Sequence, residues 1–331
     1  MQSKVAANAE AMRQWLGNAE KLLGNHSEQL NAINIFPVAD GDTGSNLYFT
    51  VKAAADAAAA LKTEDIGELF GTAAGTAMEN ARGNSGTLFS VILAAMAEPL
   101  RGAVRLTGPS LAAALESARI RSWSALSDPV AGTMLSVLEE TSRAALDADA
   151  SRTGDESSSG LVTMIESMID AARAAVVDTE SQLAPLEQAR VVDAGAVGFL
   201  LLLDALRATL VHEQTLGAVV RGLHGLGFEQ PHASRFPAKT GVEIMCTINL
   251  EPLDAANLRL QLDELGNSVI LSPVSEVSDG AGGYRWRVHV HVPEPEPALA
   301  LLKAAGEPEN LSLTDLAGEP AVHGQAADGT F

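Results

Sequence analysis

Two aspartates, Asp40 and Asp42, stand one residue apart in the segment NIFPVADGDTGSN, residues 34–46. Their charges repel one another at this spacing, so the loop needs a reason to hold them together. Two carboxylates in a glycine-bearing turn can aim their oxygens at one point, and a hard divalent cation such as Mg2+ prefers oxygen ligands. The alternative is a solvated turn in which Asp42 caps the helix expected from Ser45 onward. The spacing leaves both hypotheses open.

Three further loops of this kind each precede a predicted helix. They are ARGNSGT at residues 81–87, DPVAGTM at 128–134 and VVDAGAVG at 191–198. The start of a helix offers backbone N–H groups and the positive end of its dipole to an anion. A glycine-bearing turn that only caps the next helix is the alternative. In an antiparallel bundle alternate helix starts share one end, so the loops could converge on one anionic ligand.

The chain from residue 4 to about 213 has apolar residues at three- and four-residue spacing, interrupted by glycine, proline and capping residues. This pattern predicts helices throughout. We expect them near residues 4–23, 45–60, 65–81, 85–98, 109–126, 132–147, 158–175 and 195–212, with a short helical turn near 28–33. Eight antiparallel helices would form a bundle or a helical barrel.

The character of the sequence changes after a segment rich in glycine and proline, residues 222–240. Strands are predicted at 242–250, 267–275, 284–292 and 310–316, and helices at 254–265 and 296–305. This β-α-β-β-α-β order is typical of a ferredoxin-like sandwich. The predicted fold class is α+β. It has an all-α eight-helix barrel at residues 1–220, a linker at 221–240, a small α/β domain at 241–318 and a disordered tail at 319–331.

The composition excludes several classes of protein. A formal charge of −20 over 331 residues argues against binding nucleic acid or anionic membranes, because either polyanion would be repelled. One cysteine excludes an internal disulfide, and the N-terminal segment is amphipathic and charged, unlike a signal sequence. The longest apolar run breaks at Asp204, short of a membrane span. We therefore expect a cytoplasmic protein without an integral membrane segment, whose phosphate ligands would need local cations or metal.

Taken in order, PVADGDTGSN, ARGNSGT, GTM and VVDAG resemble the L-subunit (DhaL) domain of dihydroxyacetone kinases. The resemblance covers about residues 5–213 and is strongest to the catalytic subunits of bacterial fatty acid kinases, the FakA proteins. It implies an eight-helix barrel that binds ATP or ADP at one end through two Mg2+ ions. It also implies a fatty-acid-carrying protein as partner. FakA proteins continue into a further C-terminal domain, which this sequence lacks.

The resemblance also implies roles for individual residues. Asp40 and Asp42 would be the catalytic Mg2+ ligands that bridge to the β- and γ-phosphates, and Asn34 would provide the side-chain oxygen where the dihydroxyacetone branch has a third aspartate. Ala131 departs from the pattern, because fatty acid kinases usually carry Glu there. The other nucleotide-side residues would be Thr43, Asn46, Asn84, Ser85, Gly86, Thr133, Met134, Asp193 and Gly195.

A second metal site is suggested by Cys246 on one predicted strand and by His289 and His291 on another. The two histidines are two residues apart and share one face of their strand. If the strands adjoin, a thiolate and two imidazoles suit zinc. The alternative is a buried cysteine beside solvent-facing histidines. FakA proteins have a C-T strand and an H-V-H strand that together resemble a zinc site, so the resemblance implies Zn2+ at these three residues.

Three functions remain as hypotheses. The first is an ATP-dependent kinase that phosphorylates a fatty acid held by a separate carrier protein. The second is the L-type subunit of a dihydroxyacetone (glycerone) kinase, which relays phosphate to a sugar-binding subunit. The third is a non-catalytic nucleotide-binding scaffold whose zinc-bearing domain forms a homodimer.

Overall fold

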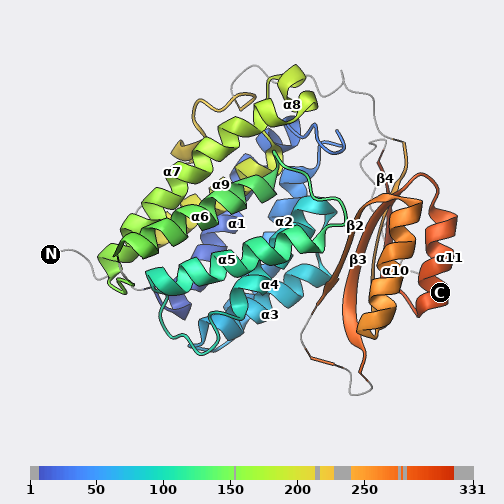
Figure 1. The fold of residues 1–331 in the computed structure, drawn as a ribbon, viewed down its shortest axis with the longest axis horizontal. Coiled ribbons are helices and arrows are strands. Elements are labelled where there is room, and N and C mark those ends of the chain that lie inside the picture. The colour runs from blue at the N-terminus through green and yellow to red at the C-terminus, as the bar shows by residue number, and fades with distance from the viewer. Residues whose placement is uncertain are drawn as a thin grey trace, which may run out of the picture.

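The computed structural model describes residues 7–152, 154–212, 217–226, 240–274, 277–278 and 282–316. These residues form a barrel of helices with a small antiparallel sheet across one end (Figure 1). The predicted fold class, an all-α barrel followed by a ferredoxin-like sandwich, is therefore confirmed. Most of the predicted linker and all of the predicted tail lie outside the described residues, and the domain boundaries stay predictions.

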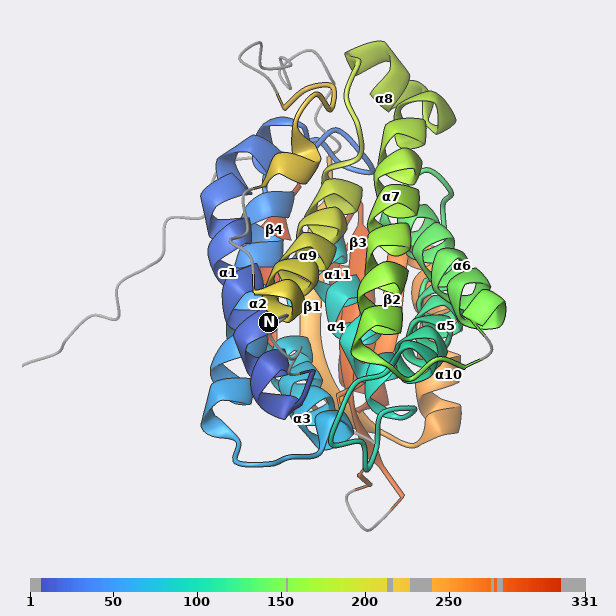
Figure 2. The same ribbon diagram turned by 90° about the vertical axis from the view of Figure 1, so that its left-hand side faces the viewer.

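Eight long helices build the barrel in the described part of the chain. They are α1 (Ala9–Ala32), α2 (Thr43–Ala60), α3 (Ile66–Glu79), α4 (Gly83–Ala97), α5 (Gly108–Ala125), α6 (Met134–Arg152), α7 (Ser158–Gln182) and α9 (Ala194–Val211). Each packs against the next, and α9 packs against both α7 and α1, which closes the ring (Figure 2). The short helices α8 (Ala184–Ala189) and η1 (Ala218–Val220) were not predicted.

The prediction of a separate helical turn near residues 28–33 was wrong. Helix α1 runs through this segment without interruption. Residues 24–29 are polar and mostly on the surface, so they hide the apolar spacing although the backbone stays helical.

Helix α9 is long and apolar enough to cross a membrane, but 89% of it is buried inside the protein. It is a core helix of the barrel. Asp204, the charge that interrupts its apolar run, is 3% exposed and lies 3.0 Å from the Nη2 atom of Arg207. A buried acid of this kind is normally paired, as it is here.

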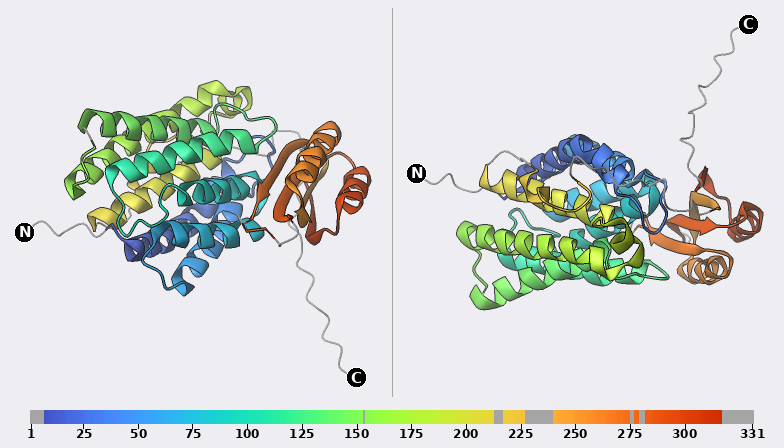
Figure 3. Two further views of the ribbon diagram at one scale, coloured as in Figure 1. Left: turned by 60° about the horizontal axis from the view of Figure 1, so that its bottom comes forward. Right: turned by 90° about the horizontal axis from the view of Figure 1, so that it is seen from above.

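The sheet has the strand order β2-β3-β1-β4, with every neighbouring pair antiparallel. Its strands are β1 (Val242–Leu250), β2 (Asn267–Pro273), β3 (Tyr284–Val292) and β4 (Glu309–Asp315). Helices α10 (Pro252–Leu265) and α11 (Pro295–Ala305) cover the face turned away from the barrel (Figures 1 and 3). The other face is turned toward the barrel end.

Hydrogen bonds connect the sheet directly to the barrel. The backbone N–H of Ser127, just beyond α5, donates to the carbonyl of Val269 in β2 at 3.2 Å. From β3, the Nη2 atom of Arg287 donates to the carbonyl of Ala81 at 2.9 Å. The barrel-facing residues of the sheet are thereby brought against the ends of α3 and α5.

Candidate functional site

A cavity of about 770 Å³ lies between the barrel end and the sheet. All four loops identified in the sequence contribute to it, so they do converge. The predicted site residues that line it are Asn34, Asp40, Asp42, Thr43, Asn46, Asn84, Ser85, Thr133, Met134, Asp193, Gly195 and His291. The sheet side adds Glu243, which the sequence could not place, and Asn267, Ser268 and Thr314, which it did not single out.

Two amide side chains of the α1 segment hold the start of α2. Asn34 Oδ1 accepts hydrogen bonds from the backbone N–H groups of Asp42 and Thr43, at 3.1 and 2.9 Å. Asn31 Oδ1 accepts from the next two N–H groups, at 2.7 and 3.1 Å. Asp42 occupies the cap position, but its side chain makes no capping hydrogen bond. The capping alternative for Asp42 is therefore wrong, and its carboxylate is left for the cavity.

Both the oxygen and the nitrogen of the Asn34 side-chain amide form hydrogen bonds. Its oxygen serves the two backbone N–H groups, and its Nδ2 atom donates to the carbonyl of Val38 at 2.8 Å. The side chain is 2% exposed. A carboxylate could accept the same bonds but could not donate to Val38. Asn34 therefore fixes the aspartate loop, and its oxygen is already engaged by backbone.

Close packing of α1 on α2 depends on Gly44. A Cβ atom at this position would lie 2.2 Å from the carbonyl oxygen of Ser27. The missing side chain lets the start of α2 approach α1 closely enough for Asn31 and Asn34 to reach its N–H groups.

The aspartate pair lies in an environment that opposes its charge. Burial raises the pKa of Asp40 to about 8, and repulsion from Asp42 adds to the shift. Burial also raises the pKa of Asp42, against the opposing effect of a hydrogen bond with Asn46. The charge of Glu243, across the cavity, raises both values. Among the described residues that line the cavity none is lysine or arginine, so no side chain of either type neutralises the pair.

The start of α4 differs from that of α2. Arg82 is its cap residue and makes no side-chain capping bond. Within the described ranges, no hydrogen bond is formed by the backbone N–H groups of Gly83, Asn84 and Ser85. The buried Oδ1 atom of Asn84 also has no partner there. These unsatisfied groups border the cavity and can receive a polar ligand.

Two residues of the same loop are directed elsewhere. Gly86 does not line the cavity in the described structure, because it packs against Thr50, whose Oγ1 atom a Cβ would approach to 2.3 Å. The guanidinium of Arg82 lies over the ring of Phe49, 4.3 Å from its centre. The cation nearest to the phosphate loop in sequence is therefore engaged with an aromatic ring.

Asp193 lies at the start of α9. Its Oδ1 atom accepts a hydrogen bond from the backbone N–H of Ala196 at 2.7 Å. Burial raises the pKa of Asp193 to about 7, although the nearby backbone N–H groups of Ala196, Met134 and Gly195 lower it. The start of α9 is therefore capped, unlike that of α4.

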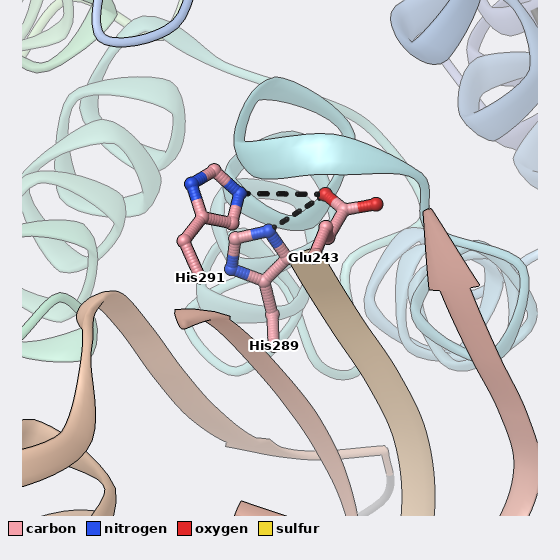
Figure 4. Close-up of side chains that lie close together, drawn as sticks. All are labelled: Glu243, His289 and His291. Carbon is pink, nitrogen blue, oxygen red and sulfur yellow. Dashed lines mark hydrogen bonds and ion pairs between the residues drawn. The ribbon is translucent and has the colours of Figure 1, made fainter. Parts of the chain in front are cut away.

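The sheet wall carries a cluster of one carboxylate and two imidazoles (Figure 4). Glu243 Oε1 lies 2.9 Å from His289 Nε2 and 3.6 Å from His291 Nε2. His289 is fully buried, and its Nδ1 atom lies 2.8 Å from the carbonyl of Ser268. Burial raises the pKa of Glu243, but hydrogen bonds to both histidines outweigh it and hold the pKa well below the usual range.

The predicted ligand set of Cys246, His289 and His291 was wrong in its cysteine. The strands adjoin as expected, but Cys246 is paired with Val288 and points into the apolar core under α10 and α11. Burial raises the pKa of its thiol to about 11. Successive side chains of a strand alternate between faces, so the histidines face away from Cys246.

Glu243 takes the place predicted for the cysteine. It stands an odd number of residues from Cys246 and is paired in register with His291. The alternation of side chains along the strands could have predicted this ligand: once β1 and β3 are aligned, Glu243 is the acid that shares a face with the two histidines.

Family models match both parts of the chain. The DAK2 domain matches residues 37–208, and the middle domain of FakA-like fatty acid kinases matches residues 239–321. Protein YloV of Bacillus subtilis is 26% identical over 267 residues, which cover 77% of this chain and 47% of YloV. An uncharacterized protein of Staphylococcus epidermidis is 28% identical over 178 residues, 54% of this chain and 31% of that protein. The matched region thus spans less than half of either relative.

One solved structure is similar at a lower level. The dihydroxyacetone kinase from C. freundii, in complex with AMP-PNP and Mg2+, superposes with a TM-score of 0.45 at 19% sequence identity. The similarity covers 62% of this chain and 35% of that one.

Proposed function

Because the chain belongs to the family of proteins that carry a DAK2 domain, we propose that it is an ATP-dependent phosphotransferase. One observation carries the proposal: Asp40 and Asp42 lie half-buried in one loop, neither carboxylate caps a helix, and no lysine or arginine of the described residues lines their cavity. A nucleoside triphosphate would add further negative charge. The arrangement suits a ligand that arrives with its own metal ions.

The aspartate pair fits Mg2+. Carboxylate oxygens are the protein ligands that Mg2+ uses beside substrate phosphates, and Asp40 and Asp42 are held in one loop by amide hydrogen bonds. When bound, two Mg2+ ions would supply the positive charge that neutralises the phosphates during transfer. Asp40 and Asp42 would hold these ions, and the side-chain amide of Asn34 fixes the backbone on either side of the pair.

The phosphates would lie against the start of α4. The unsatisfied N–H groups of Gly83, Asn84 and Ser85 would donate to phosphate oxygens, which fix the orientation of the transferred group. The lining residues Thr133 and Met134, with Asp193 and Gly195, would then border the rest of the nucleotide. In phosphoryl transfer the protein acts mainly by positioning the reacting groups and stabilising their charge.

We propose a fatty acid, presented by a separate carrier protein, as the phosphoryl acceptor. The match of residues 239–321 to the middle domain of FakA-like fatty acid kinases supports this acceptor over dihydroxyacetone. The sheet forms the wall that faces the aspartate pair, so the acceptor group would approach between the two walls. A homodimer stays a prediction.

The cluster on the sheet wall fits a second metal, for which we propose Zn2+. The ligand atoms of Glu243, His289 and His291 all lie within 4.8 Å of one another. Two imidazoles and a carboxylate are a common protein ligand set for zinc. The Ser268 carbonyl can accept from Nδ1 of His289, which leaves Nε2 free for a metal. These residues would hold the ion, and we assign no fourth ligand among the residues that the structure describes.

The test is ATP turnover by the purified protein with Mg2+ and a fatty-acid-loaded carrier. Asp40→Ala and Asp42→Ala should each reduce turnover by about 100-fold or more, the scale of losing one group that stabilises charge in the transition state. Asp56→Ala is the control, because Asp56 is an exposed acid that pairs with Lys52 on α2. Equal turnover in all variants would refute the proposal.

The acceptor is tested in the same assay. Turnover with dihydroxyacetone and a sugar-binding subunit, but not with the lipid carrier, would favour the dihydroxyacetone hypothesis. Binding of Mg-ADP without turnover for either acceptor would favour the non-catalytic scaffold.

A further inference from the structure

Arg287 is a buried guanidinium at the boundary between sheet and barrel. It is 5% exposed, and its Nη2 atom donates to the carbonyl of Ala81 at 2.9 Å, with a longer contact of 3.8 Å to Met245 Sδ. Its Nε atom has no partner among the described residues. Burying a charged group with so few hydrogen bonds is unfavourable for stability. Stability alone therefore does not explain the Ala81 contact.

The contact lies on the loop that leads into α4. Ala81 stands two residues before Gly83, whose N–H is the first of the unsatisfied groups at the cavity. From the barrel side, the Oγ1 atom of buried Thr50 accepts from the backbone N–H of Arg82 at 3.3 Å. The loop is therefore held by Thr50 on one side and by Arg287 on the other.

The kind of hydrogen bond matters for a ligand site. At α2 and α9, side-chain oxygens of Asn31, Asn34 and Asp193 accept from backbone N–H groups and so use them up. Arg287, in contrast, donates a hydrogen bond to a backbone carbonyl. A donor can fix the loop before α4 while every N–H group at the helix start stays available.

We propose that Arg287 is a positioning residue for the nucleotide: it holds Ala81 so that the N–H groups of Gly83, Asn84 and Ser85 stay directed at the cavity. The sheet then contributes to nucleotide affinity through a residue that does not touch the nucleotide. This inference rests on the proposed function, because it assumes that these N–H groups bind phosphate.

Arg285 provides a matched control. It stands two residues earlier on the same face of β3 and is also tied to the barrel, with its Nε atom 3.2 Å from Glu79 Oε1. Its Nη1 atom lies 2.7 Å from Glu309 Oε2. It secures the end of α3 without contacting the loop itself, so its removal weakens the sheet–barrel contact but spares the Ala81 bond.

The experiment measures Mg-ADP affinity by calorimetry together with the melting temperature of each nucleotide-free protein. Arg287→Met keeps an apolar stem and removes the donor, and should weaken Mg-ADP binding about tenfold. Arg287→Lys restores one donor and should recover part of that loss. Arg285→Met should stay within about twofold of the unchanged protein. Hydrogen exchange at the Arg82 N–H, which donates to Thr50, should become faster in the Arg287 variants but not in Arg285→Met.

The outcomes separate the inference from the proposed function. Unchanged Mg-ADP affinity in Arg287→Met, or an equal loss in Arg285→Met, would overturn the inference while leaving nucleotide binding intact. If the unchanged protein binds no Mg-ADP, the proposed function fails and the inference falls with it. If Arg287→Met does not fold, Arg287→Lys decides, since its shorter reach to Ala81 should still weaken binding and speed exchange at the Arg82 N–H.

Discussion

The helical wall and the sheet wall of the cavity both present carboxylates, but they place these groups in opposite electrostatic states. On the helical wall, burial raises the pKa of Asp40 to about 8 and that of Asp193 to about 7. On the sheet wall, burial also acts to raise the pKa of Glu243, yet its hydrogen bonds to His289 and His291 hold this pKa below the usual range.

The difference lies in the partners that each element provides. A strand pair brings Glu243 and His291 face to face by register, so the acid acquires imidazole partners from the fold itself. The aspartate loop brings Asp40 beside a second acid, and the amides of Asn31 and Asn34 accept from backbone N–H groups, which leaves Asn46 as the amide that serves the carboxylate of Asp42. The acid of the sheet wall thus has imidazole partners from the protein, whereas in our proposal the charge of the helical wall is neutralised by cations that come with the ligand.

The largest expected effect concerns metal on the sheet wall. Glu243→Gln keeps the size of the side chain but removes the anionic ligand, so we expect zinc bound by the purified protein to fall from about one equivalent to near none. Metal content by mass spectrometry checks this.

Cys246→Ala is the matched variant for this measurement. Cys246 points into the apolar core, so its loss should leave zinc content unchanged and lower the unfolding free energy by roughly 1 kcal/mol for the small cavity. Loss of zinc in Cys246→Ala, with retention in Glu243→Gln, would reverse our ligand assignment.

The next effect concerns Asp193 on the helical wall. Its folded pKa of about 7 lies above the ordinary value of 3.8, so its contribution to stability is complete below about pH 4 and is lost as pH rises toward 7. Asp193→Asn can still cap α9 and carries no titrating group. Without metal or nucleotide, the stability of the unchanged protein relative to this variant should fall between pH 4 and 7, by at most roughly 1.4 kcal/mol per pH unit.

Urea denaturation at several pH values measures that difference. Groups common to both proteins, including the aspartate pair, cancel in the comparison. A stability difference that stays constant from pH 4 to 8 would show that Asp193 titrates normally.

The smallest effect concerns Asn34. Asn34→Asp keeps an acceptor for the α2 start but loses the donor to the Val38 carbonyl, which should lower the unfolding free energy by roughly 1 to 3 kcal/mol. The added acid would also make the helical wall more dependent on Mg2+, so Mg2+ should stabilise this variant more than the unchanged protein. Thermal denaturation with and without Mg2+ checks both points. If Mg2+ stabilises the variant and the unchanged protein equally, the acid at position 34 does not interact with the aspartate pair.

Much of the fold could be predicted from the sequence. The long helices of the barrel and the order of strands and helices in the sheet follow from local periodicity, which depends only on neighbouring residues. The errors in predicting helices also arose from local features of the sequence. The polar residues 24–29 conceal the continuity of α1, and the short α8 carries too few residues for a periodic signal.

The candidate site could be predicted in part. The loops of residues 34–46, 81–87, 128–134 and 191–198 were recognised because their glycines, amides and acids are contiguous in the chain. The contributions of Asn31 and Arg287 were missed and Glu243 could not be placed, because each acts on residues distant in sequence.

The sequence by itself predicted which loops could bind a nucleotide and metal, since residue type and close spacing are local properties. Only the tertiary structure decided which acids have partners, which helix starts remain open and which face of β1 meets the histidines. Those outcomes depend on register and on contacts across long stretches of chain. For this reason Glu243, on the opposite face of the same strand, replaces the cysteine in the candidate ligand set.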